Sequence, residues 1–316
     1  MPVKFEKARK YVYAHGALWE RVLFSHLFEG ASLAHVHQCL TCYKNPDGGW
    51  GHGLECDIKT PDSHPLALEF ALQIVRVTGI RANSLFHDAP EWLARNRAPD
   101  GALLNPPSVL DYPCATHWKE TSGQTIPAST VGNLMRQSAV LGDIEITTQS
   151  WVLDHLTLKR IQRNDRLIAA YHAHDYFMNV SDFPDLPLYR AAVLENILSL
   201  ADAAEPQHYY QFAFFAPDPE SPVSQAASPK LKRRIFSALA KMQQSDGAWH
   251  DEYSNPHWAV WTTIMVLHVL RQHGYWQPDE FNEGIRDGGH ASTRRSIART
   301  GAPQAKSSLR GSAVNS

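Results

Sequence analysis

The sequence predicts an all-α protein in which repeated helical hairpins close into a ring around a central cavity. One turn pattern occurs three times along the 316 residues, and prolines that precede apolar helices recur at intervals of roughly 60 to 70 residues. A single helical hairpin cannot bury both of its faces, so such hairpins must stack on one another. The helices that follow the turns are apolar nearly all round, which favours a closed ring over an open solenoid.

The first part of the chain predicts outer helices followed by one buried helix. Residues 5–43 carry apolar side chains at helical spacing, with a break at Gly30, and so predict one or two amphipathic helices. Residues 45–72 then combine a glycine-rich turn, a cluster of ionisable groups and Pro65. Proline suits the first position of a helix, where its missing N–H is not needed. Residues 66–78 are mostly apolar and predict a helix buried on both faces.

The turn pattern is the same in residues 40–50, 93–103 and 239–249. Each copy has a leucine, a long polar residue four positions later, an Asp-Gly pair, and a Trp or Leu two positions after the glycine. Asp-Gly reverses the chain because glycine tolerates positive φ. In each copy a proline then begins an apolar helix. A further unit, between the second and third copies in the chain, has the proline at Pro187 but lacks the glycine turn. The helices expected to face the cavity begin at Pro65, Pro127, Pro187 and Pro256.

The third copy, with Gln243, Gly247 and Trp249, resembles the QW repeat of squalene and hopene cyclases and the repeat of protein prenyltransferase β subunits. With the other copies, the resemblance covers residues 20–275. It implies an α/α toroid over residues 1–281 whose cavity holds an isoprenoid chain. The chain lacks the Asp-x-Asp-Asp acid of the cyclases and the Asp-x-Cys zinc pair of the prenyltransferases. Because a fold does not determine a reaction, the chemistry must come from the site.

Composition and charge limit the partners and the compartment. A net charge of −2 argues against nucleic-acid binding, although residues 282–316 are basic, lack aromatic side chains and predict a disordered tail. The tail is either solvated or in contact with an acidic partner. We expect no transmembrane segment and no signal peptide, and peripheral membrane contact stays open. Four cysteines in a chain of this length favour reduced thiols and a cytoplasmic location.

The first loop contains the candidate catalytic groups. In a partly dry cavity a carboxylic acid can keep its proton, and a neighbouring histidine can relay it. A carboxylate just before a helix can instead act as a cap, and a lone histidine is often a packing residue. We assign catalysis to Asp57, Glu55, His52 and His64, and substrate contact to Trp50 and Asp62.

The matching loop of the last unit is expected to form the opposite wall. Its aromatic side chains could pack against an isoprenoid, stabilise positive charge through their ring faces, or stack on a sugar, although such residues also build cores. The substrate-binding residues expected there are His250, Asp251, Tyr253, His257, Trp258 and Trp261.

Two arrangements could bind zinc, the only cofactor that the sequence suggests. Asp111, Cys114 and His117 follow one another at three-residue spacing, and zinc accepts all three ligand types. Cys39 and Cys42 also have zinc-like spacing, but both fill positions at a helix end.

These observations leave three function classes open. The preferred reading is a cyclase-, isomerase- or transferase-like enzyme that binds a hydrophobic, isoprenoid-type small molecule and converts it by acid–base chemistry. The second is a carbohydrate-active enzyme, such as a glycoside hydrolase, lyase or epimerase, because paired carboxyl groups and tryptophans suit sugars equally well. The third is a non-catalytic binding or scaffold protein. A closed, apolar cavity would favour isoprenoids, and an open, polar cavity would favour sugars.

Overall fold

The computed structural model describes residues 3–119 and 123–277, and within them the chain is mainly helical. Its sheet has two short antiparallel strands, β1 (Leu103–Leu104) and β2 (Gln124–Thr125), with Leu103 opposite Thr125. The all-α prediction is therefore confirmed. The chain up to Pro278 forms one compact unit, and the predicted tail at 282–316 lies outside the described residues.

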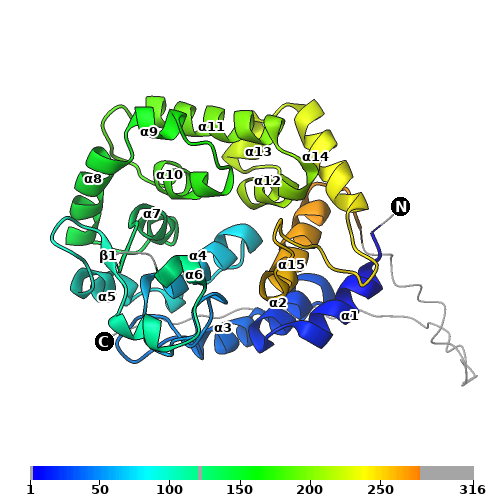
Figure 1. Ribbon diagram of the computed structural model, residues 1–316, viewed down its shortest axis with the longest axis horizontal. Helices are drawn as coiled ribbons and strands as arrows, with labels where there is room; N and C mark the ends of the chain where they lie inside the picture. Colours follow the sequence, from blue (N-terminus) through cyan, green and yellow to red (C-terminus); the bar gives the residue numbers. More distant parts are fainter. Residues whose placement is uncertain (1–2, 120–122, 278–316) are drawn as a thin grey trace, which may run out of the picture. The chain divides into compact units, whose positions relative to one another are not determined.

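In Figure 1 one set of helices lies toward the middle of the ribbon, and the other helices lie around it. The central helices are α4 (Pro65–Thr78), α7 (Ala128–Arg136), α10 (Tyr171–Phe177), α12 (Tyr209–Phe215) and α15 (Pro256–Gln272). The longer peripheral helices are α1 (Phe5–His15), α2 (Leu18–Glu29), α3 (Leu33–Thr41), α5 (Ala89–Arg95), α8 (Asp143–His155), α9 (Leu158–Gln162), α11 (Leu186–Ala203) and α14 (Pro229–Lys241). Two short helices, α6 (Thr116–Lys119) and α13 (Pro222–Ala226), lie in the connections. In α4 every residue except Gln73 is buried, as its apolar sequence predicts.

The three turn copies adopt one local structure. In each, a backbone N–H two residues further on donates to the aspartate side chain, at 2.9, 3.1 and 3.0 Å for Asp47, Asp100 and Asp246. The glycine that directly follows each aspartate has a positive φ, which is 91° at Gly48, 94° at Gly101 and 105° at Gly247. Glycine adopts this left-handed region without strain. The repeat identified in the sequence is therefore a structural repeat.

The prolines open helices, but one of these helices is not central. Pro65 and Pro256 begin α4 and α15, and Pro127 is the residue before α7. Pro187 is the second residue of α11, a peripheral helix in Figure 1, and the neighbouring Leu188 is 55 % exposed. The central helix of that unit is α10, which follows a 3-10 turn instead of a proline. The expectation that Pro187 opens a cavity-facing helix is therefore wrong.

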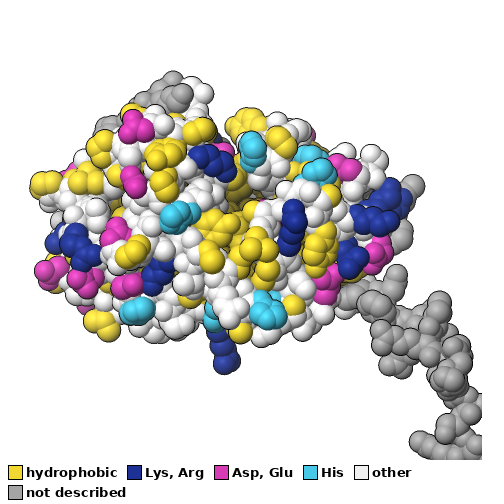
Figure 2. Space-filling view, turned by 90° about the horizontal axis from the view of Figure 1, so that it is seen from below, with side chains coloured by type: hydrophobic (Ala, Val, Ile, Leu, Met, Phe, Trp, Pro, Cys, Tyr) yellow, Lys and Arg dark blue, Asp and Glu magenta, His cyan; other side chains and the backbone are white. Residues whose placement is uncertain are grey.

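The surface carries both signs of charge. On the face drawn in Figure 2, acidic and basic side chains are interspersed, and hydrophobic side chains gather around the middle of the face. Among the described residues, no helix is both long enough and apolar enough to cross a membrane.

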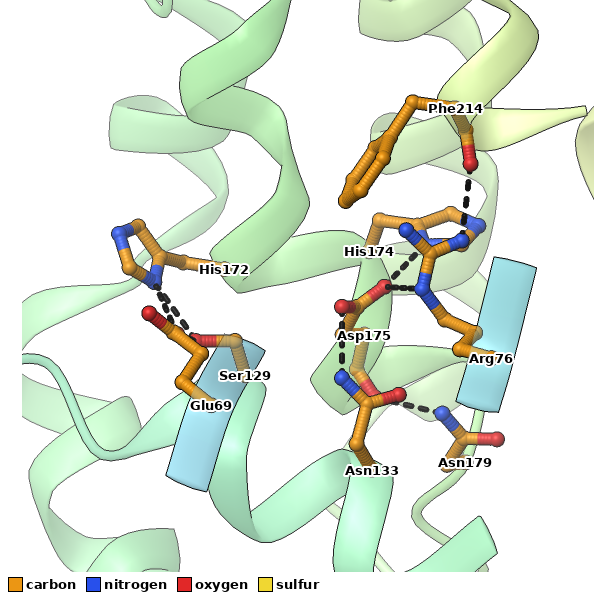
Figure 3. Close-up of polar contacts among 9 residues, drawn as sticks. All are labelled: Glu69, Arg76, Ser129, Asn133, His172, His174, Asp175, Asn179 and Phe214. Carbon is orange, nitrogen blue, oxygen red and sulfur yellow. Dashed lines mark hydrogen bonds and ion pairs between the residues drawn. The ribbon is translucent and has the colours of Figure 1, made fainter. Parts of the chain in front are cut away.

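A buried ion pair joins the central helices (Figure 3). Arg76 Nε of α4 lies 3.3 Å from Asp175 Oδ1 of α10, and Arg76 Nη1 donates to the carbonyl oxygen of Phe214 in α12 at 2.9 Å. Asn133 of α7 donates to Asp175 Oδ2 at 2.7 Å, and His174 contacts Oδ1 at 2.7 Å. Burial alone would raise the pKa of Asp175, but Arg76 and these hydrogen bonds hold it below its usual value. The Asp175 carboxylate thereby links α4, α7 and α10, and the Arg76 guanidinium adds α12.

Candidate active site

A cavity of about 680 Å³ lies among the central helices. The loop before α4 contributes Glu55 and Asp57, and the loop before α15 contributes Asp251 and Tyr253. Trp258 Nε1 of α15 donates to Asp57 Oδ1 at 3.2 Å, so the first loop contacts the first turn of α15 at the cavity wall. The repeat pattern predicted this meeting of the first and last units.

Aromatic side chains form much of the remaining wall. Phe70 meets Trp258 and Trp261 edge to face, with ring centroids 5.3 and 5.8 Å apart. Such ring faces can stack on a sugar or attract a positive charge. The aromatic residues that line the cavity include Phe70, Tyr171, Tyr210, Phe214, Trp258 and Trp261.

Glu69 is a carboxyl group placed within the most apolar helix. It lies in the second turn of α4, lines the cavity and is only 5 % exposed. Ser129 of α7 donates a hydrogen bond to Oε1, and the Tyr171 hydroxyl donates to Oε2 at 3.2 Å. Burial raises the pKa of Glu69 to about 7. A large share of the molecules therefore carries a neutral carboxylic acid at this position near pH 7.

A hydrogen-bonded chain connects Glu69 to a histidine (Figure 3). His172 Nδ1 lies 2.8 Å from Ser129 Oγ and 3.7 Å from Glu69 Oε1. Burial lowers the pKa of His172 to about 4, so the ring is neutral at pH 7. When Ser129 donates to the glutamate, its oxygen can accept from Nδ1–H of the imidazole, and both bonds can reverse. The chain can therefore carry a proton to or from Glu69.

Two further carboxyl groups differ in their surroundings. Glu55 is 6 % exposed, and its Oε2 accepts a hydrogen bond from the Asp57 backbone at 3.0 Å. Burial, reinforced by the charge of Asp57, raises the pKa of Glu55 well above its usual value. On another part of the wall, Tyr210 donates to Glu252 Oε2, and Gln211 donates to Oε1 at 3.1 Å. The cavity thus contains two carboxyl groups whose pKa is raised by burial, Glu69 and Glu55, and a third, Glu252, that is held by two donors.

Other predicted first-loop residues lie away from the cavity. Trp50 is fully buried and stacks on Phe86 at 5.3 Å. His64 is the N-cap of α4, its Nδ1 accepts from the Ala67 backbone at 3.3 Å, and burial lowers its pKa to about 4. These positions favour packing for Trp50 and capping for His64.

Two more first-loop predictions also fall outside the wall of this cavity. His52 Nε2 lies 2.8 Å from the side-chain oxygen of Asn45, within the turn itself. Asp62 is exposed, and its backbone N–H contacts Thr60 Oγ1 at 3.3 Å. Neither side chain lines the cavity.

The residues predicted in the last unit divide between several places. Asp251, Tyr253, Trp258 and Trp261 line the cavity, with Tyr253 76 % exposed at its edge. Asp251 Oδ1 also accepts from the Asn255 backbone at 2.8 Å, and burial raises its pKa. His257 lines a neighbouring cavity of about 150 Å³. His250 lies 3.9 Å from Asp246 in the last turn copy.

The structure shows no ligand set at Cys39 and Cys42. Among the side chains that it describes, no three of the types His, Cys, Asp and Glu are grouped so that they could hold a metal ion. Cys39 is buried in the core, and Cys42 is exposed. Asp111 is exposed and Cys114 is half-buried, while the His117 side chain lies outside the described part of the chain.

Glu69, Ser129 and His172 were not among the residues predicted from the sequence. One signal was present for Glu69, because it is the single acidic residue of a mainly apolar stretch, and glutamate is rarely buried without a partner. Ser129 and His172 carry no such local signal. They become candidates only through their contacts with Glu69.

Comparison with known proteins identifies no family for this chain. No protein-family model matches it, and no curated protein shows significant sequence similarity to it. The function is therefore inferred from the cavity and its side chains.

Proposed function

We propose that this protein is an acid–base enzyme whose active site is the central cavity and whose general acid is Glu69. The observation that supports this proposal is a buried carboxyl group on the cavity wall with a pKa of about 7. A general acid works best when its pKa lies near the working pH. The chain through Ser129 to His172 would return the proton after each turnover.

We also propose that the helices form an α/α toroid like that of terpenoid cyclases and protein prenyltransferase β subunits. Contacts of α4 with α7, α7 with α10, α12 with α15, and α15 with α4, together with the ring contact of His174 in α10 with Phe215 in α12, support a closed inner layer. The repeated Asp-Gly turn at three joints supports the same arrangement. In this fold the cavity lies on the ring axis, where residues from distant units can act together.

A neutral, sugar-like substrate fits the acidity of Glu69 best. An isolated alkene is a very weak base, so its protonation requires a strong acid. A carboxyl group with a raised pKa is instead suited to protonating the oxygen of a breaking glycosidic bond. Glu69 would give its proton to that oxygen, and Ser129 and Tyr171 would stabilise the resulting carboxylate. Asp57 or Glu252 would provide the second carboxyl group.

An isoprenoid-type substrate is the second candidate, and one observation favours it. The cavity wall is largely aromatic, and ring faces stabilise developing positive charge. In that case Glu69 would act as a base that removes a proton, or would protonate an activated double bond. A hydrophobic ligand of this kind would also allow peripheral membrane contact.

Ligand binding distinguishes these candidates. Purified protein would be screened by native mass spectrometry for bound molecules, and by thermal shift against neutral oligosaccharides and farnesol. We expect an oligosaccharide to raise the melting temperature and to be cleaved by the wild type. The Glu69→Gln variant should bind it without cleaving it, and Glu91→Gln, whose side chain is 79 % exposed, should behave like the wild type. Stabilisation by farnesol alone would favour the isoprenoid candidate, and binding without turnover of any ligand would favour a scaffold.

A cytoplasmic location is part of the same proposal. All four cysteines are free thiols, and none forms a disulfide. Thiols persist in reducing compartments. The interspersed charges in Figure 2 give no basic stripe on that face, consistent with a small-molecule substrate instead of a nucleic acid.

A further inference from the structure

A second cavity of about 630 Å³ lies beside α9, α10 and α11. It shares no lining residue with the central cavity. Its walls come from the chain segment that carries the second and third units, away from the loops of the candidate active site. The proposed reaction gives this cavity no role.

The charged residues that line this cavity are all cationic. Lys159 and Arg160 belong to α9, and Arg163 follows it directly. No aspartate or glutamate lines the cavity, and within the described residues none of the three cations forms an ion pair. All three cations are exposed to solvent, and three positive charges around one concave site attract an anion more strongly than the same charges spread over a convex surface.

The rest of the lining is mainly aliphatic. Ile126 and Ala169 are half-buried, whereas Leu156, Ile161 and Val193 are buried, and all five line the cavity. The two asparagines of the lining already bond each other, since Asn164 Nδ2 donates to Asn196 Oδ1 at 3.0 Å. An inorganic anion would therefore leave most of this wall without a matching partner. A molecule with an aliphatic part would cover it and gain from the burial of apolar surface.

We propose that this second cavity binds an amphiphilic anion, an aliphatic chain that ends in a phosphate or carboxylate group. The head group would pair with Arg160, Arg163 and Lys159, because guanidinium groups match the oxygens of both anions with two parallel hydrogen bonds. The chain would lie along the half-buried Ile126 and Ala169. This site is separate from the active site and does not depend on the proposed reaction.

The second cavity nevertheless reaches the candidate active site through one side chain. His172 lines it, and His172 Nδ1 lies 3.7 Å from Glu69 Oε1. A ligand in the second cavity would thus lie one residue away from the proposed general acid. Any effect of that ligand on turnover rests on the proposed function, whereas its binding does not.

Isothermal titration of the full chain with decyl phosphate and decanoate, both below their micelle concentrations, tests the site. We expect one equivalent of at least one of them to bind. The double variant Arg160→Gln/Arg163→Gln should weaken that binding about tenfold or more, because it removes charge-assisted hydrogen bonds. The matched control, Lys230→Gln/Arg233→Gln on exposed positions of α14, should bind as the wild type does.

Three results would overturn the proposal. These are no binding of either amphiphile, equal binding of both by the double variant, and binding of inorganic phosphate as tight as that of decyl phosphate. No binding would mean that the cavity does not take this kind of ligand. Equal binding by the double variant would mean that the ligand binds elsewhere, and equally tight binding of inorganic phosphate would mean that the aliphatic wall contributes nothing. Glu69→Gln should bind decyl phosphate unchanged, so failure of the proposed reaction and failure of this site can be told apart.

Discussion

Trp258 Nε1 donates a hydrogen bond to Asp57 Oδ1 at 3.2 Å, and this bond joins residues 201 positions apart. It ties the loop of the first repeat unit to the first turn of the last central helix. Both side chains line the central cavity, so the bond also fixes an acid next to an aromatic ring in the wall. A substrate that stacks on the indole would therefore lie next to the carboxyl group of Asp57.

The Asp57→Asn variant separates the charge of this residue from its shape. An asparagine oxygen can still accept from Trp258, so we expect the melting temperature to change by only a few degrees. Turnover of the saccharide found in the ligand screen should fall about 100-fold or more, as is typical when an acid–base group is lost. Unchanged turnover would pass the role of second carboxyl group to Glu252. Loss of folding would make Asp57 a structural residue.

Asp175 should matter far more for stability than a surface acid does. Asp175→Asn leaves the Arg76 guanidinium buried without a counter charge, at 2 % side-chain exposure. We expect a loss of about 3–5 kcal/mol in the free energy of unfolding, measured by urea titration. The matched control is Glu29→Gln, which removes the partner of Arg9, 44 % exposed, and should cost about 1 kcal/mol or less. Equal losses in both variants would contradict a structural role for the buried pair.

Gly132 lets α7 approach α10 closely enough for Ser129 to reach His172. A Cβ atom at this position would lie 2.1 Å from the carbonyl oxygen of Asp175, a backbone atom that cannot move aside cheaply. We expect Gly132→Ala to cost about 2 kcal/mol or more in unfolding free energy and to reduce turnover. Gly79→Ala is the control, because its Cβ would meet nothing within 4 Å and only its φ of 68° would cost about 1 kcal/mol. If Gly132→Ala proves no worse than the control, the close approach is not required.

The parts of the fold that could be predicted from the sequence depend on local chemistry. Asp47, Asp100 and Asp246 form the same turn because an aspartate oxygen and a following glycine suffice to reverse the chain. Pro65 and Pro256 mark the starts of α4 and α15 for an equally local reason. Once the units are aligned, it follows that equivalent loops lie at the same cavity, and Asp57 and Trp258 meet there.

The rest depends on contacts between distant segments. Glu69 and Ser129 are 60 positions apart, and Ser129 and His172 are 43 apart, so no local pattern links them. Neither a proline nor an Asp-Gly turn precedes α10. The proline pattern therefore pointed to Pro187, which lies at the start of the peripheral α11. Because the sequence did not predict α10 as a central helix, it gave no role to His172 or Asp175, which both lie on it. Glu69 is surrounded in the sequence by apolar residues. These residues indicate a buried helix and give no sign that one of its side chains lines a cavity.

The pH dependence of stability provides a direct check on Glu69. Its pKa is about 7 in the folded protein, against an ordinary value of 4.5. Between these values the folded protein holds a proton that the unfolded chain has released, so the free energy of unfolding falls as the pH rises. The stability due to this proton is fully present below pH 4.5 and is lost by the time the pH has passed 7, a change of about 3 kcal/mol.

The Glu69→Gln variant has no titrating group at this position. The difference in unfolding free energy between the variant and the wild type, measured by urea titration, should therefore shift in favour of the variant by about 3 kcal/mol from pH 4.5 to 8. Buried acids such as Glu20 and Glu55 act in both proteins and cancel in the difference. Parallel stability curves for the wild type and the variant would mean that Glu69 has an ordinary pKa, and the proposed general acid would lose its basis.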